Sequence, residues 1–318
     1  MIIGISSGDI NGIGIEVTLK AIQKRKWPDD VSFKIIGSEK VIKEQSNHLG
    51  INIPEKVTYE NIGDVNWYPG ELRTDASHLA YNAIDYGITS CLSNKIDALV
   101  TSPISKSGFK KANINFPGHT EILGKMTKSS NFGMMLIGGG LRVMLVTRHI
   151  PLSNVAKSIT HKKIKDAIDL SKEGLEWLGV INGKIGVCGL NPHAGDGGAL
   201  GKEEIEIINP VINSYKNKNL NISGTHSADT IFFDAKNGKY ECVIAMYHDQ
   251  GLGPLKTIGF DEGVNLTLGL PIIRTSPDHG TAFNLAGKNQ ASPLSMINAI
   301  KIAIELARKK NPWKTQKN

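Results

Sequence analysis

Three histidines at separate glycine- or proline-marked junctions are the residues of this chain best suited to chemistry. His149, His193 and His248 each follow an apolar run that is typical of a strand. Parallel sheets place their ligand sites just beyond the carboxyl ends of strands. Three imidazoles delivered there could hold one divalent metal with an open coordination position, and imidazole suits zinc, cobalt, nickel, iron or manganese better than calcium. The alternative for each is an ordinary core histidine, because the long spacings form no compact HExxH-type motif.

Two further segments carry groups suited to an anionic substrate. A proline-glycine turn presents His119 and Thr120 just before a predicted helix, where they contact substrate or are simply half-buried. Lys256 and Arg274 are cations in glycine-rich apolar surroundings, and together with the carboxamide of Asn265 they would suit a phosphate or carboxylate. The alternative is that both cations extend to solvent.

The turn Asp278-His279-Gly280-Thr281 is a candidate for cradling the adenosine or phosphate of a cofactor, or else a simple surface turn. A second glycine-rich string, Gly8 to Gly14, follows the first predicted strand and superficially suggests a dinucleotide fingerprint. Val17 stands where the third glycine belongs, so a tight strand-to-helix turn is the better interpretation. The sequence contains no GxxxxGK[ST] string, the phosphate-binding motif of P-loop nucleoside triphosphatases, so that class is not indicated.

The elements that must position these residues alternate between strands and helices, which predicts an α/β fold with a mainly parallel sheet. The expected strands are Ile2–Ile5, Val31–Ile36, Ala98–Thr101, Met134–Ile137, Val143–Thr147, Ile185–Cys188, Val243–Met246 and Val264–Leu268. The expected helices include Asp75–Cys91, Lys162–Leu178 and Ser292–Arg308, the last with Ser292 as its cap and proline at the first helical position. We expect two discontinuous lobes with a cleft between them, residues 1–122 plus 272–318 and residues 123–271, the second carrying much of the metal and substrate site.

Composition narrows the class of protein. The 318 residues are 40% apolar and 21% charged, which is enough for a large core. The net charge is +7, but the lysines are scattered apart from a tail at residues 308–317, and aromatics are only 6%. This pattern favours anionic small substrates over nucleic acid. The three cysteines form no CxxC pair, and no leader or membrane-length apolar run is visible, so we expect a cytoplasmic protein with no membrane contact.

Taken together, ordered strings along nearly the whole chain resemble the 4-hydroxythreonine-4-phosphate dehydrogenase family of vitamin B6 biosynthesis. The strings are Gly8-Asp9…Gly12-Ile13-Gly14…Glu16, Thr101-x-Pro103-Ile104-x-Lys106, Pro117-Gly118-His119-Thr120-Glu121, His149-Ile150-Pro151-Leu152, Asn191-Pro192-His193-Ala194-Gly195, Ala228-Asp229-Thr230, Tyr247-His248-Asp249-Gln250-Gly251, Lys256, Asn265-x-Thr267-Leu268-Gly269-Leu270-Pro271 and Arg274-Thr275-Ser276-x-Asp278-His279-Gly280-Thr281-Ala282.

The resemblance implies a two-lobed fold like that of isocitrate and isopropylmalate dehydrogenases, which bind NAD without the glycine fingerprint. It implies a homodimer with a shared active site, whose metal (Zn, Mg, Co or Mn) takes histidines from both subunits. The family's metal-binding histidines fall on His149, His193 and His248. Its substrate-binding positions are His119, Thr120, Lys256, Asn265 and Arg274.

The implied reaction is NAD- or NADP-dependent oxidation of 4-phosphohydroxy-L-threonine to a β-keto acid, which decarboxylates to 3-amino-2-oxopropyl phosphate. Candidates for the proton acceptor are Lys256, Asp229 and Asp249, and Asp249 is alternatively a partner that orients a histidine. The family usually has Pro-Ala at Ile10-Asn11, a proline at Ile15 and a proline-bearing turn near Gly224–Ser227. These departures leave open a phosphorylated sugar acid, such as erythronate or threonate 4-phosphate, as substrate. A metal-dependent hydrolase and a non-catalytic anion-binding protein are further alternatives.

Overall fold

The chain divides into two compact units that alternate strands and helices, which confirms the α/β fold. The computed structural model describes residues 1–218, 220–309 and 311–313. Unit 1 is Met1–Ser130 with Leu270–Asn318, and unit 2 is Asn131–Gly269. The first boundary lies later than residue 122 because helix α5 (His119–Thr127) packs on α3 (Thr74–Leu92) and so belongs to unit 1. Of the basic tail, Lys310, Lys314 and Lys317 lie outside the described residues.

The sheet of unit 1 is parallel throughout, in the order β3-β2-β1-β4-β11. Central strands β1 and β4 are almost wholly buried, as expected of apolar runs covered on both faces. The strands are β1 (Ile2–Ser6), β2 (Ser32–Gly37), β3 (Val57–Asn61), β4 (Ala98–Thr101) and β11 (Arg274–Pro277).

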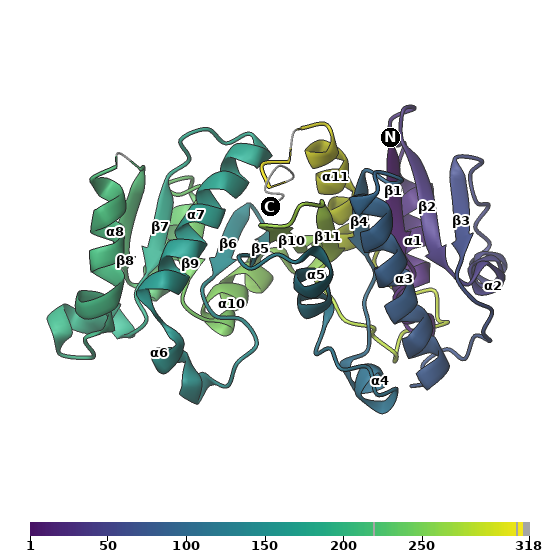
Figure 1. The fold of residues 1–318 in the computed structure, drawn as a ribbon, viewed down its shortest axis with the longest axis horizontal. Helices are drawn as coiled ribbons and strands as arrows, with labels where there is room; N and C mark the ends of the chain where they lie inside the picture. The colour runs from purple at the N-terminus through teal and green to yellow at the C-terminus, as the bar shows by residue number, and fades with distance from the viewer. Residues whose placement is uncertain (219, 310, 314–318) are drawn as a thin grey trace. The chain divides into compact units, whose positions relative to one another are not determined.

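Helices cover both faces of this sheet (Figure 1). Helix α3 packs on β1, β2 and β4 from one side, while α1 and α11 pack together on the other. The helices besides α3 and α5 are α1 (Gly14–Lys24), α2 (Glu39–Leu49), α4 (Lys106–Lys111) and α11 (Leu294–Ala307).

Unit 2 has a mixed sheet in the order β10-β5-β6-β9-β7-β8. Strands β10, β5 and β6 pair antiparallel, and β6, β9, β7 and β8 pair parallel. The strands are β5 (Gly133–Gly138), β6 (Leu141–Leu145), β7 (Ile185–Cys188), β8 (Ile222–His226), β9 (Cys242–Ala245) and β10 (Val264–Leu268).

The helices of unit 2 also lie on both faces of its sheet, with α7 on one side and α9 and α10 on the other (Figure 1). Alternate residues of the strands, such as Val143 and Leu145, meet Phe232 of α9 and Leu252 of α10 in one buried cluster. The helical segments are η1 (Leu152–Asn154), α6 (Val155–Ser158), α7 (His161–Leu178), η2 (Pro192–Gly198), η3 (Glu204–Ile208), α8 (Asn209–Lys216), α9 (Ala228–Lys236), α10 (His248–Gly259) and η4 (Phe260–Glu262).

The eight predicted strands and three predicted helices are confirmed, with ends shifted by a residue or two. The predicted cap of the last helix is wrong in detail. Helix α11 begins at Leu294 and Pro293 occupies its N-cap, while the Ser292 hydroxyl accepts a long hydrogen bond of 3.5 Å from the Leu294 N–H. Among the described residues, no helix combines the length and the apolar character that crossing a membrane requires.

Candidate functional site

Two of the three predicted histidines lie side by side in unit 2. Strands β6 and β9 are parallel neighbours, so the residues that follow them emerge at the same sheet edge. His149 follows β6, His248 begins α10 after β9, and their ring centroids are 5.4 Å apart. Helix α10 packs so closely on β6 that a Cβ on Gly251 would come within 2.7 Å of Val143 Cγ1. This close packing fixes the first turn of α10, and with it His248.

The orientation of His248 is set by its neighbour. Nδ1 of His248 lies 2.7 Å from Oδ1 of Asp249, whose side chain is otherwise exposed. When that nitrogen donates to the carboxylate, the other ring nitrogen carries the lone pair that binds a metal. The contact therefore favours the orienting role for Asp249 among the two that the sequence left open.

His193 occupies an unusual turn beside a pocket of about 320 Å³. The residues 193–197 all have positive φ angles, three of them non-glycine, and each non-glycine residue costs on the order of 1 kcal/mol in this conformation. The pocket also contains Asp229 from the first turn of α9 and Tyr247 beside His248. Its lining is Leu190, Asn191, Pro192, His193, Ser227, Ala228, Asp229, Tyr247 and Gln250.

Gln250 joins the two strand ends that lead to His193 and His248. Its Nε2 donates to the carbonyl of Gly189 at 2.8 Å, and its Oε1 accepts from the Met246 N–H at 2.7 Å. The side chain is buried, so both polar ends are satisfied away from water. Gln250 thus holds the end of β7 at a fixed distance from the end of β9.

The three histidines do not form one cluster within the part of the chain that the structure describes. There, no group of three or more His, Cys, Asp or Glu side chains is arranged to hold a metal ion. His149 and His248 are adjacent, and His193 lies in the neighbouring pocket with Asp229. Within one chain, the three imidazoles therefore do not converge on one point as the sequence had predicted.

The other predicted residues of unit 2 lie on α10 and β10. Lys256 is half-buried, with its ammonium 5.6 Å from the ring centroid of Phe260. Asn265 lies on β10, and its Oδ1 is buried without a hydrogen-bond partner among the described residues. A buried acceptor left in this state costs about 1–3 kcal/mol, which is typical of a group kept for a ligand.

Arg274 is the most deeply buried cation predicted for the site. It opens β11 in unit 1, is 2% exposed, and donates from Nε and Nη2 to the Thr101 hydroxyl at 3.1 and 2.6 Å. Burial lowers its pKa to about 9, so the guanidinium stays charged at neutral pH at a cost in solvation. An anion that reaches it would be bound strongly, since little water competes.

His119 and Thr120 begin α5 in the same unit, and Thr120 is also buried. Burial first, and then the charge of Arg274, hold the pKa of His119 well below its usual range. The ring is therefore neutral at physiological pH, and its Nε2 is buried without a partner among the described residues. A neutral imidazole beside a buried guanidinium suits recognition of an oxyanion or hydroxyl group.

The candidate cofactor turn, residues 278–281, follows β11 and is held by the glycine-rich turn after β1. The Ile13 N–H donates to the Thr281 carbonyl at 3.0 Å, and a Cβ on Gly12 would lie 2.7 Å from that same oxygen. Glu16 and Lys20 of α1 continue the attachment by bonding the backbone of Ala291. The glycine string thus serves close backbone packing, as the tight-turn interpretation expected.

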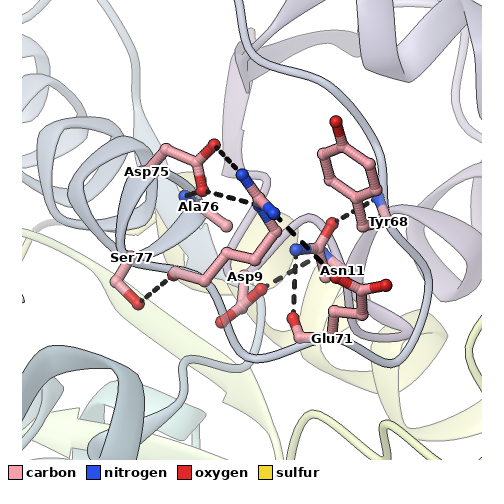
Figure 2. A network of polar contacts seen from close by, with 8 residues as sticks. Asp9, Asn11, Tyr68, Glu71, Asp75, Ala76 and Ser77 are labelled. Atoms are coloured by element: carbon pink, nitrogen blue, oxygen red, sulfur yellow. Dashed lines mark hydrogen bonds and ion pairs between the residues drawn. The ribbon is translucent and has the colours of Figure 1, made fainter. Parts of the chain in front are cut away.

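A polar network that the sequence did not reveal surrounds Asp9 in unit 1 (Figure 2). Asn11 is fully buried, accepts from the Tyr68 N–H at 2.9 Å and donates to the Glu71 carbonyl at 3.1 Å. Asp9 accepts from the Asn11 N–H, while its Oδ2 has no partner among the described residues. Burial, with a smaller contribution from Asp75, raises the pKa of Asp9 to about 6. Asn11, one of the positions where the sequence departs from the family pattern, therefore fixes the turn at residues 68–71, where the sequence showed no motif.

Sequence reasoning also missed Glu204, a buried acid in η3 that accepts hydrogen bonds from the residues before His193. The one signal in the sequence was the pair Glu203-Glu204 directly before an apolar helical stretch, and acidic residues in such pairs are more often exposed than buried.

Comparison with known proteins finds a family similar to this chain over nearly its whole length. The family model for pyridoxal phosphate biosynthetic protein PdxA matches residues 15–303. A 4-hydroxythreonine-4-phosphate dehydrogenase from Vibrio vulnificus is 37% identical over 324 residues, covering 96% of this chain and 98% of the relative. A D-threonate 4-phosphate dehydrogenase from Cupriavidus necator is 36% identical over 323 residues, with 96% and 97% covered. The crystal structure of 4-hydroxythreonine-4-phosphate dehydrogenase from Klebsiella pneumoniae has a TM-score of 0.84 at 32% identity, covering 97% of this chain and 98% of that one.

Proposed function

The chain belongs to the PdxA family of pyridoxal phosphate biosynthetic proteins, and from that premise we propose that it is a metal-dependent 4-hydroxythreonine-4-phosphate dehydrogenase. It would oxidise the C3 hydroxyl of 4-phosphohydroxy-L-threonine with NAD or NADP, giving a β-keto acid. Loss of carbon dioxide then gives 3-amino-2-oxopropyl phosphate for pyridoxine 5′-phosphate synthesis. The observation that carries the proposal is the 37% identity to a relative of this activity over 96% of the chain.

The residues proposed to hold the divalent metal are His149, His193 and His248. The orientation of His248 by Asp249 and the exposure of His149 and His193 suit ligands that an ion must reach from solution. When bound, the metal supplies Lewis-acid polarisation of the substrate hydroxyl and, later, stabilisation of enolate charge. We propose, from the family resemblance, that the histidines come from both subunits of a homodimer.

We propose that the phosphate or carboxylate of the substrate is bound by a cationic donor, Arg274, and a neutral donor, His119. Arg274, with Thr101 fixing its fork, supplies a buried charge, and His119 supplies an uncharged ring nitrogen beside it. Thr120, at the same helix start, is assigned a hydroxyl contact. In unit 2 the ammonium of Lys256 and the unsatisfied oxygen of Asn265 are assigned to the substrate as well. Such anchoring turns binding energy into orientation of the reacting hydroxyl.

The proton leaving the hydroxyl is assigned to Lys256 or Asp229. Asp249 is already engaged with His248, whereas Asp229 lies in the pocket beside His193 and Lys256 is half-buried on α10. The turn of residues 278–281 is the proposed contact for the nicotinamide cofactor. The described cysteines, Cys91, Cys188 and Cys242, are buried and unbridged, and a cytoplasmic location remains part of the proposal.

A second candidate keeps the chemistry and changes the substrate to a phosphorylated sugar acid. The relative from Cupriavidus necator is a D-threonate 4-phosphate dehydrogenase at nearly the same identity. The dehydrogenase relatives leave the hydrolase and binding-protein alternatives without support.

The test is NADH formation by the purified protein with 4-phosphohydroxy-L-threonine, and in parallel with threonate and erythronate 4-phosphates, each with and without chelator. We expect chelator-sensitive turnover of the amino acid. Turnover of the sugar acids alone would move the protein to the second candidate. If no substrate gives NADH or NADPH in the presence of zinc, cobalt, magnesium or manganese, the dehydrogenase proposal fails.

A further inference from the structure

The turn that carries His193 needs support from outside itself. His193, Ala194, Gly195, Asp196 and Gly197 have φ angles of 50°, 53°, 82°, 44° and 63°. A run of left-handed residues persists only where surrounding contacts determine it more strongly than the local preferences oppose it. The side chain of His193 is itself exposed, so packing of the imidazole does not provide that support.

The support comes from the carboxylate of Glu204, which is 1% exposed. Its Oε1 accepts from the backbone N–H groups of Leu190 and Asn191, both at 2.8 Å. Its Oε2 accepts from Nδ2 of Asn191 at 3.0 Å. Three donors converge on one buried carboxylate, so they fix the two residues that lead into the turn.

The turn also closes around the same carboxylate. A Cβ on Gly195 would lie 2.6 Å from Oε2 of Glu204, and a Cβ on Gly189 would lie 2.7 Å from Cα of Ala194. The Leu200 N–H donates to the Gly195 carbonyl at 3.0 Å. Glu204 is not among the residues that line the pocket, so any effect it has on a ligand there passes through the turn.

We infer that Glu204 is a positioning residue that holds the His193 imidazole in place for the divalent metal. The inference rests on the proposed function, in which His193 is a ligand. Gln250 complements it by fixing the end of β7 relative to the start of α10. Glu204 fixes the turn, and Gln250 fixes the end of β7, from which the turn begins.

The decisive variant is Glu204→Gln in the full-length protein. The amide keeps the size of the side chain, but placing its NH₂ toward Asn191 Nδ2 sets two donors against each other. We expect cobalt(II) affinity, measured by competition with a chromophoric chelator, to fall about 10- to 100-fold, with an altered visible spectrum of the bound cobalt. The matched control is Glu206→Gln, which removes an exposed charge from the same segment and should bind cobalt like the wild type.

A double-mutant cycle separates positioning from general damage to the fold. In a His193→Ala background, Glu204→Gln should cause no further loss of cobalt affinity, because the group it positions is gone. An equal loss in both backgrounds, or wild-type affinity in Glu204→Gln alone, would overturn the inference. If Glu204→Gln does not fold, Glu204→Asp keeps the charge but withdraws the carboxylate from the N–H groups of Leu190 and Asn191, and unchanged cobalt affinity there would overturn it too.

Failure of the proposed function looks different. If His193→Ala itself binds cobalt like the wild type, His193 is not a ligand, and the metal assignment fails regardless of Glu204. If His193→Ala loses cobalt and Glu204→Gln does not, the metal assignment stands and only the positioning role is lost.

Discussion

The two units hold their reactive groups by opposite means. In unit 1, Arg274 is 2% exposed and His119 is kept neutral by burial, so the protein interior itself surrounds the groups assigned to the anion. In unit 2, His149 and His193 are exposed, and the buried group is Glu204, which bonds the backbone of the residues before His193. A buried cation gains affinity for an anion because water does not compete, whereas a metal ligand must remain accessible to an ion from solution.

This difference predicts which property each substitution changes. Replacing a buried group of unit 1 should alter stability as well as substrate affinity. Replacing an exposed imidazole of unit 2 should alter metal binding while leaving the thermal midpoint almost unchanged.

The largest expected effect is on the histidines. His149→Ala, His193→Ala and His248→Ala should each lower kcat by at least about 10³-fold, since each removes a proposed metal ligand, with little change in the melting temperature of the metal-free protein. Mixing pairs of these variants tests the shared site. If two histidines come from one subunit and one from the other, two of the three mixtures recover about a quarter of wild-type activity, because mixed dimers regain one intact site. Recovery in none of the mixtures would contradict a shared site.

An intermediate effect is expected at Arg274. Arg274→Lys loses the guanidinium fork that bonds Thr101 twice. The charge-assisted contacts that the fork would make to the substrate anion are worth about 1.5–3 kcal/mol, so we expect roughly a 10- to 100-fold loss in kcat/KM. The loss should appear mainly in KM and should be accompanied by a shifted melting temperature. Thr101→Val is the companion variant, which keeps the charge and should lose less. An unchanged KM in Arg274→Lys would remove the anion assignment from unit 1.

The smallest expected effect concerns Asp9, whose pKa of about 6 in the folded protein exceeds its ordinary value of 3.8. The folded state therefore retains the proton to higher pH than the unfolded state, and wild-type stability falls as pH rises from about 4 to about 6. Asp9→Asn removes that penalty, so relative to wild type it should gain at most about 3 kcal/mol of unfolding free energy by pH 7, less the cost of burying its NH₂ group. Urea unfolding at pH 4.5 and pH 7 measures the gain. The exposed Asp29→Asn serves as control, and a difference independent of pH would show that burial does not perturb Asp9.

Sequence alone predicted the strands whose burial is dictated by apolar side chains. The three strands it missed have other reasons to exist. Within the described ranges, strands β3 and β8 each pair with one neighbour and bury only their first residue, so apolar runs are unnecessary in them. Strand β11, Arg-Thr-Ser-Pro, is buried although polar, because its side chains bond neighbouring elements, as Arg274 does to Thr101 and Thr275 to the Ala299 carbonyl.

The candidate site residues could be named from the sequence only where the residue type itself indicates a chemical role. Histidines at strand ends are visible in a sequence, and the family resemblance assigned them roles. Glu204 and Asn11 act through distances to backbone groups, which no spacing in the sequence encodes. Residues proposed to bind a ligand are therefore easier to predict from a sequence than residues that hold the backbone around them.

The discontinuity of unit 1 has a consequence for synthesis on the ribosome. Residues 131–269 form unit 2 completely, whereas unit 1 still lacks β11 and α11 when unit 2 has been made. Until Arg274 and Thr275 emerge, the edge of β4 has no β11 to pair with, and α1 has no α11 to pack against. The nascent chain thus carries a finished unit 2 while the edge of β4 in unit 1 is still open, and an open strand edge invites pairing with other chains. In this fold, the segment that begins at Leu270 completes the unit that begins at Met1.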